Sequence, residues 1–388
     1  MEKIIFFVLH LEMFLCAIYS GKIISRNVYE KYWSYALFPI LSYGVVSGLR
    51  FGRMVDWNLY YHRYIEMGND FWSSDYEICF RAINYSFYNL GFPYWFFIFS
   101  QCLFLMISMF ILFKNYNNEI LYILPISLVL IHNNELYIRW YTAFSFFLIS
   151  LSFMIRDEKI KSILFFLIAC LTHFGIILLF PIIIFSKILN KYSIHPLIGC
   201  SLYIFVLFSM SITKLSFLSS FTDYLLKLNI ITNESAIFYM NNTDALINGE
   251  FGGVGFKESD GILKTIRLLV GYLPLILFSL KSCKNRKYGV LEYNVFVIGV
   301  VLSPLFYSIE ITDRYAGAMT FFGCLCAGHL AYDTFIENTT NTSKFQKILI
   351  SVCLIANIWP LLSICWTVDN INEMLYIWDE NGRKYLPY

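Results

Sequence analysis

The sequence predicts an all-α integral membrane protein that crosses the bilayer many times. Hydrophobic residues make up 58% of its 388 residues and charged residues only 14%, whereas a soluble chain carries roughly 25% charged residues. The apolar residues gather in repeated runs of about 18 to 22, the length that a helix needs to cross a bilayer. The formal net charge of +2 gives no electrostatic case for nucleic-acid binding.

The apolar runs, taken in order, predict the spans. The first begins at Ile4 and is expected to be retained, because Glu2 offsets Lys3 and no small-residue cleavage pattern follows. The spans are predicted at roughly residues 4–20, 33–49, 94–113, 119–133, 136–154, 162–186, 196–213, 262–281, 291–309, 314–333 and 346–366. Two polar stretches, 50–93 and 214–261, are too long for tight connections and are expected to be large extracytoplasmic loops. Residues 1–388 are expected to form a single transmembrane domain.

The basic residues predict the orientation of these spans. Lysines and arginines cluster at 22–31, 156–161 and 281–287, and each cluster favours a cytoplasmic connection. Eleven spans that each cross the membrane once conflict with this pattern, because the cluster at 281–287 would then lie on the extracytoplasmic side. The conflict disappears if 162–186 is a re-entrant hairpin that turns near His173, which brings the total to about 11 or 12 spans. The alternative is an extra short span within 214–231, which Asp223 and Lys227 disfavour.

Charged side chains next to the second span indicate a binding site. Arg50, Arg53 and Asp56 follow the apolar run directly. The planar guanidinium pairs with phosphate through two parallel hydrogen bonds and keeps its charge. The alternative is that the arginines only extend toward the membrane interface.

Arg139 lies about one turn inside a span, with Glu135 four residues earlier on the same helical face. A charge at that depth needs a partner or a cavity, so it indicates a functional site. A purely structural Glu135–Arg139 pair is the alternative.

His173 stands alone within a long apolar run, at the predicted turn of the hairpin. It is either a histidine satisfied in the interior or a catalytic group that accepts a proton from a sugar hydroxyl. Because of the hairpin, we expect His173 to share the extracytoplasmic side with the two large loops and with the charged segment 310–314.

Two further groups are candidates. Arg314 is expected to hold a phosphate oxygen, with Asp313 or Glu310 as base or orienting group, although an ordinary charged turn is the alternative. In the first large loop, Glu77 lies among aromatic residues that include Tyr60, a combination common in sugar sites and also at membrane interfaces. The chain has no phosphate-binding loop motif for ATP and no cysteine or histidine spacing typical of a metal site.

The order of these motifs resembles the EpsG-like branch of bacterial Wzy-type polysaccharide polymerases. The matching positions span about residues 40–330 and are Gly48-Leu49-Arg50, Asp56, Tyr60, Tyr76-Glu77, Ile138-Arg139, His173 and Asp313-Arg314-Tyr315. The chain departs from the usual pattern around Trp57, at Trp140 where glutamine is common, and at Phe174-Gly175 where serine often follows the histidine.

The resemblance implies a GT-C-like, metal-independent glycosyltransferase without a cofactor in the bacterial inner membrane, with its active site facing the periplasm or exterior. The implied substrates are oligosaccharide repeat units on undecaprenyl pyrophosphate, joined into O-antigen, capsule or exopolysaccharide. Membrane lipid, a chain-length regulator and a flippase are the implied partners. His173, Glu77, Glu310 or Asp313 is then the base. The implied substrate-binding residues are Arg50, Arg53, Asp56, Tyr60, Glu135, Arg139 and Arg314.

Three other functions fit the same residues. A non-catalytic flippase or transporter also uses buried charges and broken helices, but it predicts an internal repeat, and none is evident in this chain. An O-antigen ligase uses the same arginine and histidine chemistry with a different acceptor. A glycosyltransferase that uses polyprenyl monophosphate sugars is expected to carry an acidic pair in the first large loop, where Asp70, Asp75 and Glu77 lie.

Overall fold

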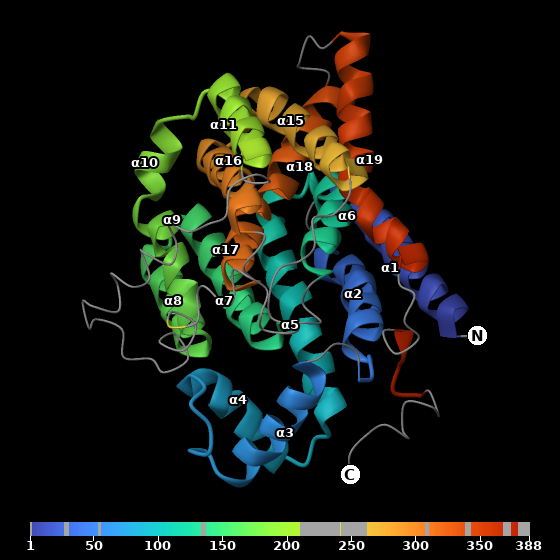
Figure 1. The fold of residues 1–388 in the computed structure, drawn as a ribbon, viewed down its shortest axis with the longest axis vertical. Helices are drawn as coiled ribbons and strands as arrows, with labels where there is room; N and C mark the ends of the chain where they lie inside the picture. The colour runs from blue at the N-terminus through green and yellow to red at the C-terminus, as the bar shows by residue number, and fades with distance from the viewer. Residues whose placement is uncertain are drawn as a thin grey trace. The chain divides into compact units, whose positions relative to one another are not determined.

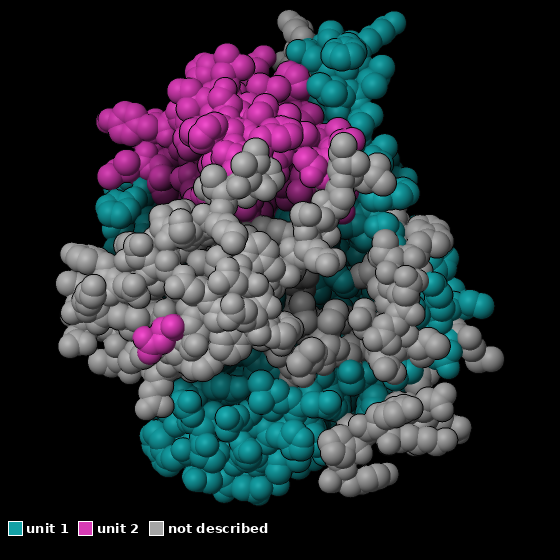
Figure 2. Space-filling model, in the orientation of Figure 1, with its two compact units in different colours: residues 1–187, 327–388 teal, residues 188–326 magenta. Residues whose placement is uncertain are grey.

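The structure is a computed structural model. It describes residues 2–26, 31–52, 56–132, 137–209, 241, 262–306, 310–337, 343–367 and 374–378, and helices dominate these ranges. The chain divides into two compact units, residues 1–187 with 327–388 and residues 188–326, coloured teal and magenta in Figure 2.

The larger unit, formed by residues 1–187 and 327–388, is a packed set of helices (Figure 1). Its helices are α1 (Glu2–Arg26), α2 (Tyr32–Tyr43), η1 (Gly44–Gly48), α3 (Asp56–Asn69), α4 (Ile78–Asn89), α5 (Tyr94–Phe113), η2 (Lys114–Tyr116), α6 (Ile120–Leu130), α7 (Ile138–Ile155), α8 (Lys159–Thr172), η4 (Phe174–Leu179), α9 (Phe180–Ile184) and α19 (Lys344–Thr367). Two helices cross the boundary between the units, α10 (Ser186–Lys191) and α18 (Phe322–Phe335). Within the unit, α7 packs against both α5 and α8, and α1 packs against α2 and α6.

The described residues include 5 helices that are long and apolar enough to cross a membrane. They are Glu2–Arg26, Tyr94–Tyr116, Ile138–Ile155, Thr265–Lys284 and Lys344–Leu361. Shorter apolar helices, such as Pro196–Ser209, accompany them. The chain is therefore an all-α polytopic membrane protein, as the sequence predicts, and the total of about 11 or 12 spans stays a prediction.

The segment 50–93, predicted as a large loop, contains two helices. α3 and α4 pack against each other and are 14 and 12 residues long. At 1.5 Å per residue, helices of this length are too short to cross the hydrocarbon core of roughly 30 Å. Both are amphipathic. The segment is therefore helical, although it does not span a membrane.

The predicted span 162–186 folds back on itself at His173. α8 ends at Thr172, His173 is extended (φ −153, ψ 110), and a 3₁₀-helix leads into α9. The rings of Phe166 and Phe180 stack with their centroids 5.1 Å apart, so the two arms of the hairpin lie side by side. This confirms the fold-back predicted from the basic residues. The side of the membrane on which the turn lies stays a prediction.

Four helices lie wholly within the described residues of the second unit. They are α11 (Pro196–Ser209), α15 (Ile262–Lys284), α16 (Gly289–Phe306) and α17 (Glu310–Thr320). Gly299 lets α16 and α17 approach closely, because a Cβ at Gly299 would lie 2.7 Å from the Thr320 backbone nitrogen. The charged segment 310–314 is the first turn of α17, not a turn between helices. Residues 214–261, the second predicted loop, lie outside the described residues except at position 241.

The predicted span 314–333 is interrupted. α17 ends at Thr320 and α18 begins at Phe322, with a single non-helical residue between them. The Thr320 hydroxyl donates to the Gly317 carbonyl oxygen at 3.0 Å. Such local hydrogen bonds from threonine compete with the helix backbone and often bend it.

Residues 374–378 form a C-terminal bridge with the segment that follows η1. The Phe51 N–H donates to the Leu375 carbonyl oxygen, and the Ile377 N–H donates to the Leu49 carbonyl oxygen, each at 3.0 Å. Met374 and Tyr376 pack with Phe6 of α1. The bridge therefore ties the C-terminal region to the stretch that carries Arg50.

We expect Ile377→Pro to lower the stability of the protein by about 1–3 kcal/mol, because proline lacks the N–H that bonds to Leu49. Thermal unfolding of the purified full chain in detergent measures this change. Ile377→Ala is the matched control, since it shortens the side chain and keeps the N–H. Equal unfolding midpoints for the two variants would show that the bridge does not contribute to stability.

Candidate active site

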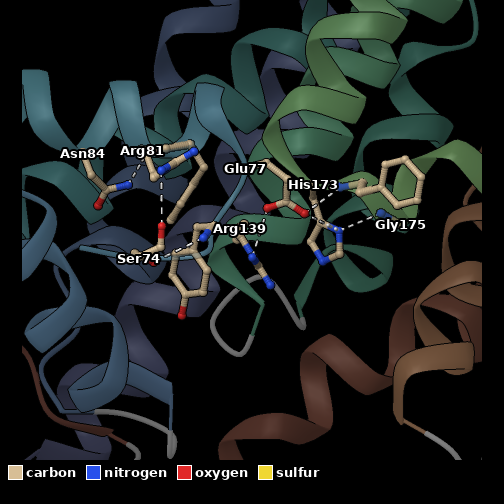
Figure 3. Close-up of polar contacts among 10 residues, drawn as sticks. Ser74, Glu77, Arg81, Asn84, Arg139, His173 and Gly175 are labelled. Atoms are coloured by element: carbon tan, nitrogen blue, oxygen red, sulfur yellow. Dashed lines mark hydrogen bonds and ion pairs between the residues drawn. The ribbon is translucent and has the colours of Figure 1, made fainter. Parts of the chain in front are cut away.

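Three helix ends that are far apart in the sequence meet in the larger unit. Glu77 directly precedes α4, Arg139 is the second residue of α7, and His173 directly follows α8 (Figure 3). The side chains of Glu77, Arg139 and His173 are 21%, 23% and 15% exposed. They are therefore held by the fold and still open to a ligand.

The Glu77 carboxylate joins the other two groups. Its Oε2 lies 3.0 Å from Nη1 of Arg139, and its Oε1 accepts a hydrogen bond from the Phe174 N–H at 2.8 Å. The His173 Nδ1 lies 4.0 Å from the same Oε1. Glu77 thereby fixes the start of α7 and the turn after α8 relative to each other.

The local structure around α4 explains why Glu77 reaches this position. Its backbone is extended (φ −62, ψ 148) at the N-cap of α4, and its side chain makes no capping bond there. Arg81, one turn later, donates to the Ser74 carbonyl oxygen at 3.3 Å, and its guanidinium lies 4.7 Å from the Trp72 ring. Arg81 therefore braces the turn that carries Glu77. The sequence analysis did not identify Arg81. The sequence shows there only a basic residue four positions after Glu77, in a segment predicted as a loop.

Arg139 has an environment suited to an anion. Its guanidinium lies 4.2 Å from the ring centroid of Tyr76, a cation–π contact that holds the group in place. Its Nε is buried and has no hydrogen-bond partner among the described residues. Because Glu77 and Arg139 lie at the starts of α4 and α7, the positive ends of both helix dipoles are close by.

The hydrogen bonds of His173 define which of its nitrogens carries the proton. Nδ1 accepts the Gly175 N–H at 3.0 Å, so in the neutral ring the proton lies on Nε2. The ring also meets the Trp140 ring edge to face, with the centroids 5.4 Å apart. In the neutral ring Nε2 is thus the donor, and the acceptor nitrogen Nδ1 is engaged with the backbone.

Other predicted residues lie in different places. The Tyr60 ring is 6.2 Å from that of Tyr76 and thus adjoins the Arg139 environment. Arg50 is fully buried at the C-terminal bridge, where its guanidinium donates to the Ser47 carbonyl oxygen. Asp313 and Arg314 lie in the first turns of α17, in the second unit.

Several predicted residues fall outside what the structure describes. Arg53 and Glu135 lie outside the described residues, and the side chains of Asp56 and Glu310 are not described. The predicted Glu135–Arg139 pair is thus not tested, whereas Glu77 is an observed partner of Arg139. Within the described ranges, no three His, Cys, Asp or Glu side chains are grouped closely enough to hold a metal ion.

Comparison with known proteins identifies a matching family. The model of the EpsG family matches residues 33–369, which is most of the chain. No curated protein and no solved structure matches the sequence. The matched range contains Glu77, Arg139 and His173, the whole second unit and most of the first.

Proposed function

The chain belongs to the EpsG family of Wzy-like polysaccharide polymerases, and from that premise we propose that it joins oligosaccharide repeat units carried on undecaprenyl pyrophosphate. The reaction is proposed to take place at the extracytoplasmic face of the bacterial inner membrane. The observation that carries this proposal is the meeting of Arg139, Glu77 and His173 at three helix ends. Together they supply a cation for a phosphate leaving group, a carboxylate and a hydrogen-bond donor.

The proposed transfer breaks one bond and forms another. A hydroxyl at the non-reducing end of a new repeat unit attacks the anomeric carbon of the growing chain. The bond from that carbon to the pyrophosphate breaks, and the electron pair leaves with the pyrophosphate on its polyprenyl carrier. The hydroxyl proton passes to a carboxylate.

Arg139 is proposed to bind the pyrophosphate. The leaving group gains negative charge in the transition state, and a prepositioned cation stabilises that charge. The Tyr76 ring and the two helix N-termini hold Arg139 ready for this role. In this scheme, the protein's own cations neutralise the leaving group and no metal ion is needed.

We assign His173 the donor role, because its Nδ1 is engaged with the Gly175 N–H and its proton lies on Nε2. It is proposed to donate to a phosphate oxygen. The base is then a carboxylate, and we assign this role to Glu77, which lies beside Arg139 and His173 in the described residues. Each carboxylate oxygen has a second lone pair, so Glu77 can still accept a proton or a further hydrogen bond.

Two other functions have to be distinguished from a polymerase. An O-antigen ligase would use the same transfer chemistry, whereas a flippase would move the substrate without a chemical reaction. Surface polysaccharide from cells lacking this gene separates them on a gel. We expect loss of the polymer ladder, with a single repeat unit still attached to the lipid acceptor. Loss of every repeat unit would instead support a ligase or a flippase. An unchanged ladder would contradict all three functions.

The proposed topology has a separate test. In a cysteine-free variant, we expect Phe174→Cys to react with a membrane-impermeant thiol reagent from outside the cell, since Phe174 is 59% exposed at the turn of the hairpin. Lys284→Cys, in the strongest basic cluster, is expected to react only after the membrane is opened. Labelling of both positions from the same side would contradict the re-entrant hairpin.

A further inference from the structure

Beside α3 lies a cavity of about 900 Å³ that the proposed reaction does not use. Its volume falls within the range of small-ligand sites, roughly 300–1,000 Å³. Aromatic rings form most of its wall, among them Trp57, Tyr61, Tyr64 and Tyr94. None of the described residues that line it carries a charge, so its chemistry differs from that of the Arg139 site.

The aromatic rings are held in fixed orientations. Trp57 and Tyr61 are stacked, with their planes 10° apart, and the Tyr94 ring meets Trp57 edge on at 75°. The Tyr64 hydroxyl donates to the Phe92 carbonyl oxygen at 2.7 Å, and burial raises the pKa of Tyr64 to about 12, so its phenol stays neutral. Ile377 of the C-terminal bridge closes part of the wall. These contacts therefore fix the shape of the aromatic wall.

Trp57 distinguishes between the ligands that such a cavity can hold. Its side chain is 3% exposed, and its indole Nε1–H has no hydrogen-bond partner among the described residues. A buried donor without an acceptor is costly. A sugar offers hydroxyl oxygens to that donor and apolar C–H faces to the rings, whereas a polyprenyl or acyl chain offers no acceptor.

The cavity is close to the site of the proposed reaction. Tyr60 and Tyr61 are consecutive on α3, and consecutive side chains of a helix point about 100° apart. The Tyr60 ring contacts Tyr76, which lies against Arg139, while the Tyr61 ring faces Trp57 in the cavity. The helix α3 thus separates the cavity from the Arg139 site, and a saccharide of several rings can contact both.

We propose that this cavity is a carbohydrate subsite, which holds a neutral sugar ring of the bound saccharide away from the reacting bond. The Tyr61 and Trp57 rings contact the C–H face of the sugar ring, and a shift of the side chains that cover Trp57 Nε1 brings this donor within reach of a sugar hydroxyl. The inference rests on the proposed function for the identity of the saccharide. It adds a binding element that the reaction centre does not contain.

The test uses the full-length protein in lipid nanodiscs and two soluble probes. One is a lipid-free oligosaccharide of one or two repeat units, cut from the polysaccharide of the producing strain. The other is farnesyl phosphate, a short polyprenyl chain without sugar. Calorimetry measures binding of each to the wild type, to Trp57→Phe, which keeps a ring and removes the N–H, and to Tyr61→Ala. Trp33→Phe, on an exposed side chain of α2, is the matched control.

We expect Trp57→Phe to weaken oligosaccharide binding about tenfold, the loss of one hydrogen bond, and Tyr61→Ala to weaken it at least as much. Farnesyl phosphate binding should not change, and Trp33→Phe should affect neither probe. Unchanged oligosaccharide binding in both cavity variants, or weaker binding of farnesyl phosphate instead, would overturn the subsite. A failure of the proposed function gives a different result. If oligosaccharide binding depends on Trp57 but the protein makes no polymer in cells, the subsite stands and the polymerase function is rejected.

Discussion

Replacing Arg139 with alanine is expected to abolish the polymer while the protein remains in the membrane. Arg139 is the one cation that the structure places beside both Glu77 and His173 among the described residues. Loss of a single group that stabilises transition-state charge typically costs about 10²–10³ in rate. We therefore expect a decrease of at least about a hundredfold, measured as polymer in cells that carry the variant as their only copy.

Arg139→Lys tests whether the fork of the guanidinium matters, since lysine keeps the charge and loses the paired hydrogen bonds. We expect it to fail as well. Arg63→Ala is a close control: Arg63 also lies near the Tyr76 ring, at 5.9 Å, but its ion pair with Glu66 is more exposed. Exposed pairs contribute little, so polymer should persist. Normal polymer from Arg139→Ala would reject the phosphate-binding role.

Substitutions at His173 are expected to separate its structural role from its chemical role. His173→Asn keeps an oxygen near the position of Nδ1 that can accept the Gly175 N–H, and it loses the donor at Nε2. His173→Gln places an amide N–H closer to the position of Nε2. If the Nε2 proton acts on the substrate, Asn should give a folded protein without polymer, and Gln should retain part of the activity.

The measurement combines the polymer ladder with thermal unfolding of each purified variant. We expect His173→Ala to lose the polymer and also to unfold at a lower temperature, because the Gly175 N–H loses its partner. His173→Asn should recover the unfolding temperature and not the polymer. A fully active Asn variant would restrict His173 to holding the turn between α8 and η4.

Much of the fold can be predicted from the sequence, because hydropathy and helix length are local properties. Each predicted span that falls in described residues corresponds to helix, and the fold-back at His173 follows from the conflict between basic clusters. The helices of segment 50–93 were missed because their aromatic and polar residues suit both a loop and an amphipathic helix. The break at Phe321 was missed because a local bend leaves the hydropathy of a span unchanged.

The sequence also identified Glu77, Arg139 and His173 as separate candidates, since isolated charges near apolar runs require a partner or a function. Their assembly was decided by tertiary structure. Sequence spacing relates side chains only within one helix, so it suggested Glu135, which lies outside the described residues, and could not suggest Glu77, an observed partner of Arg139 that is 62 residues away. The burial of Arg50, the engaged Nδ1 of His173 and the Trp57 cavity likewise depend on how separate helix ends pack together. The sequence by itself identified the candidate residues, because charge and hydropathy are local, and only packing determined which of the described ones meet.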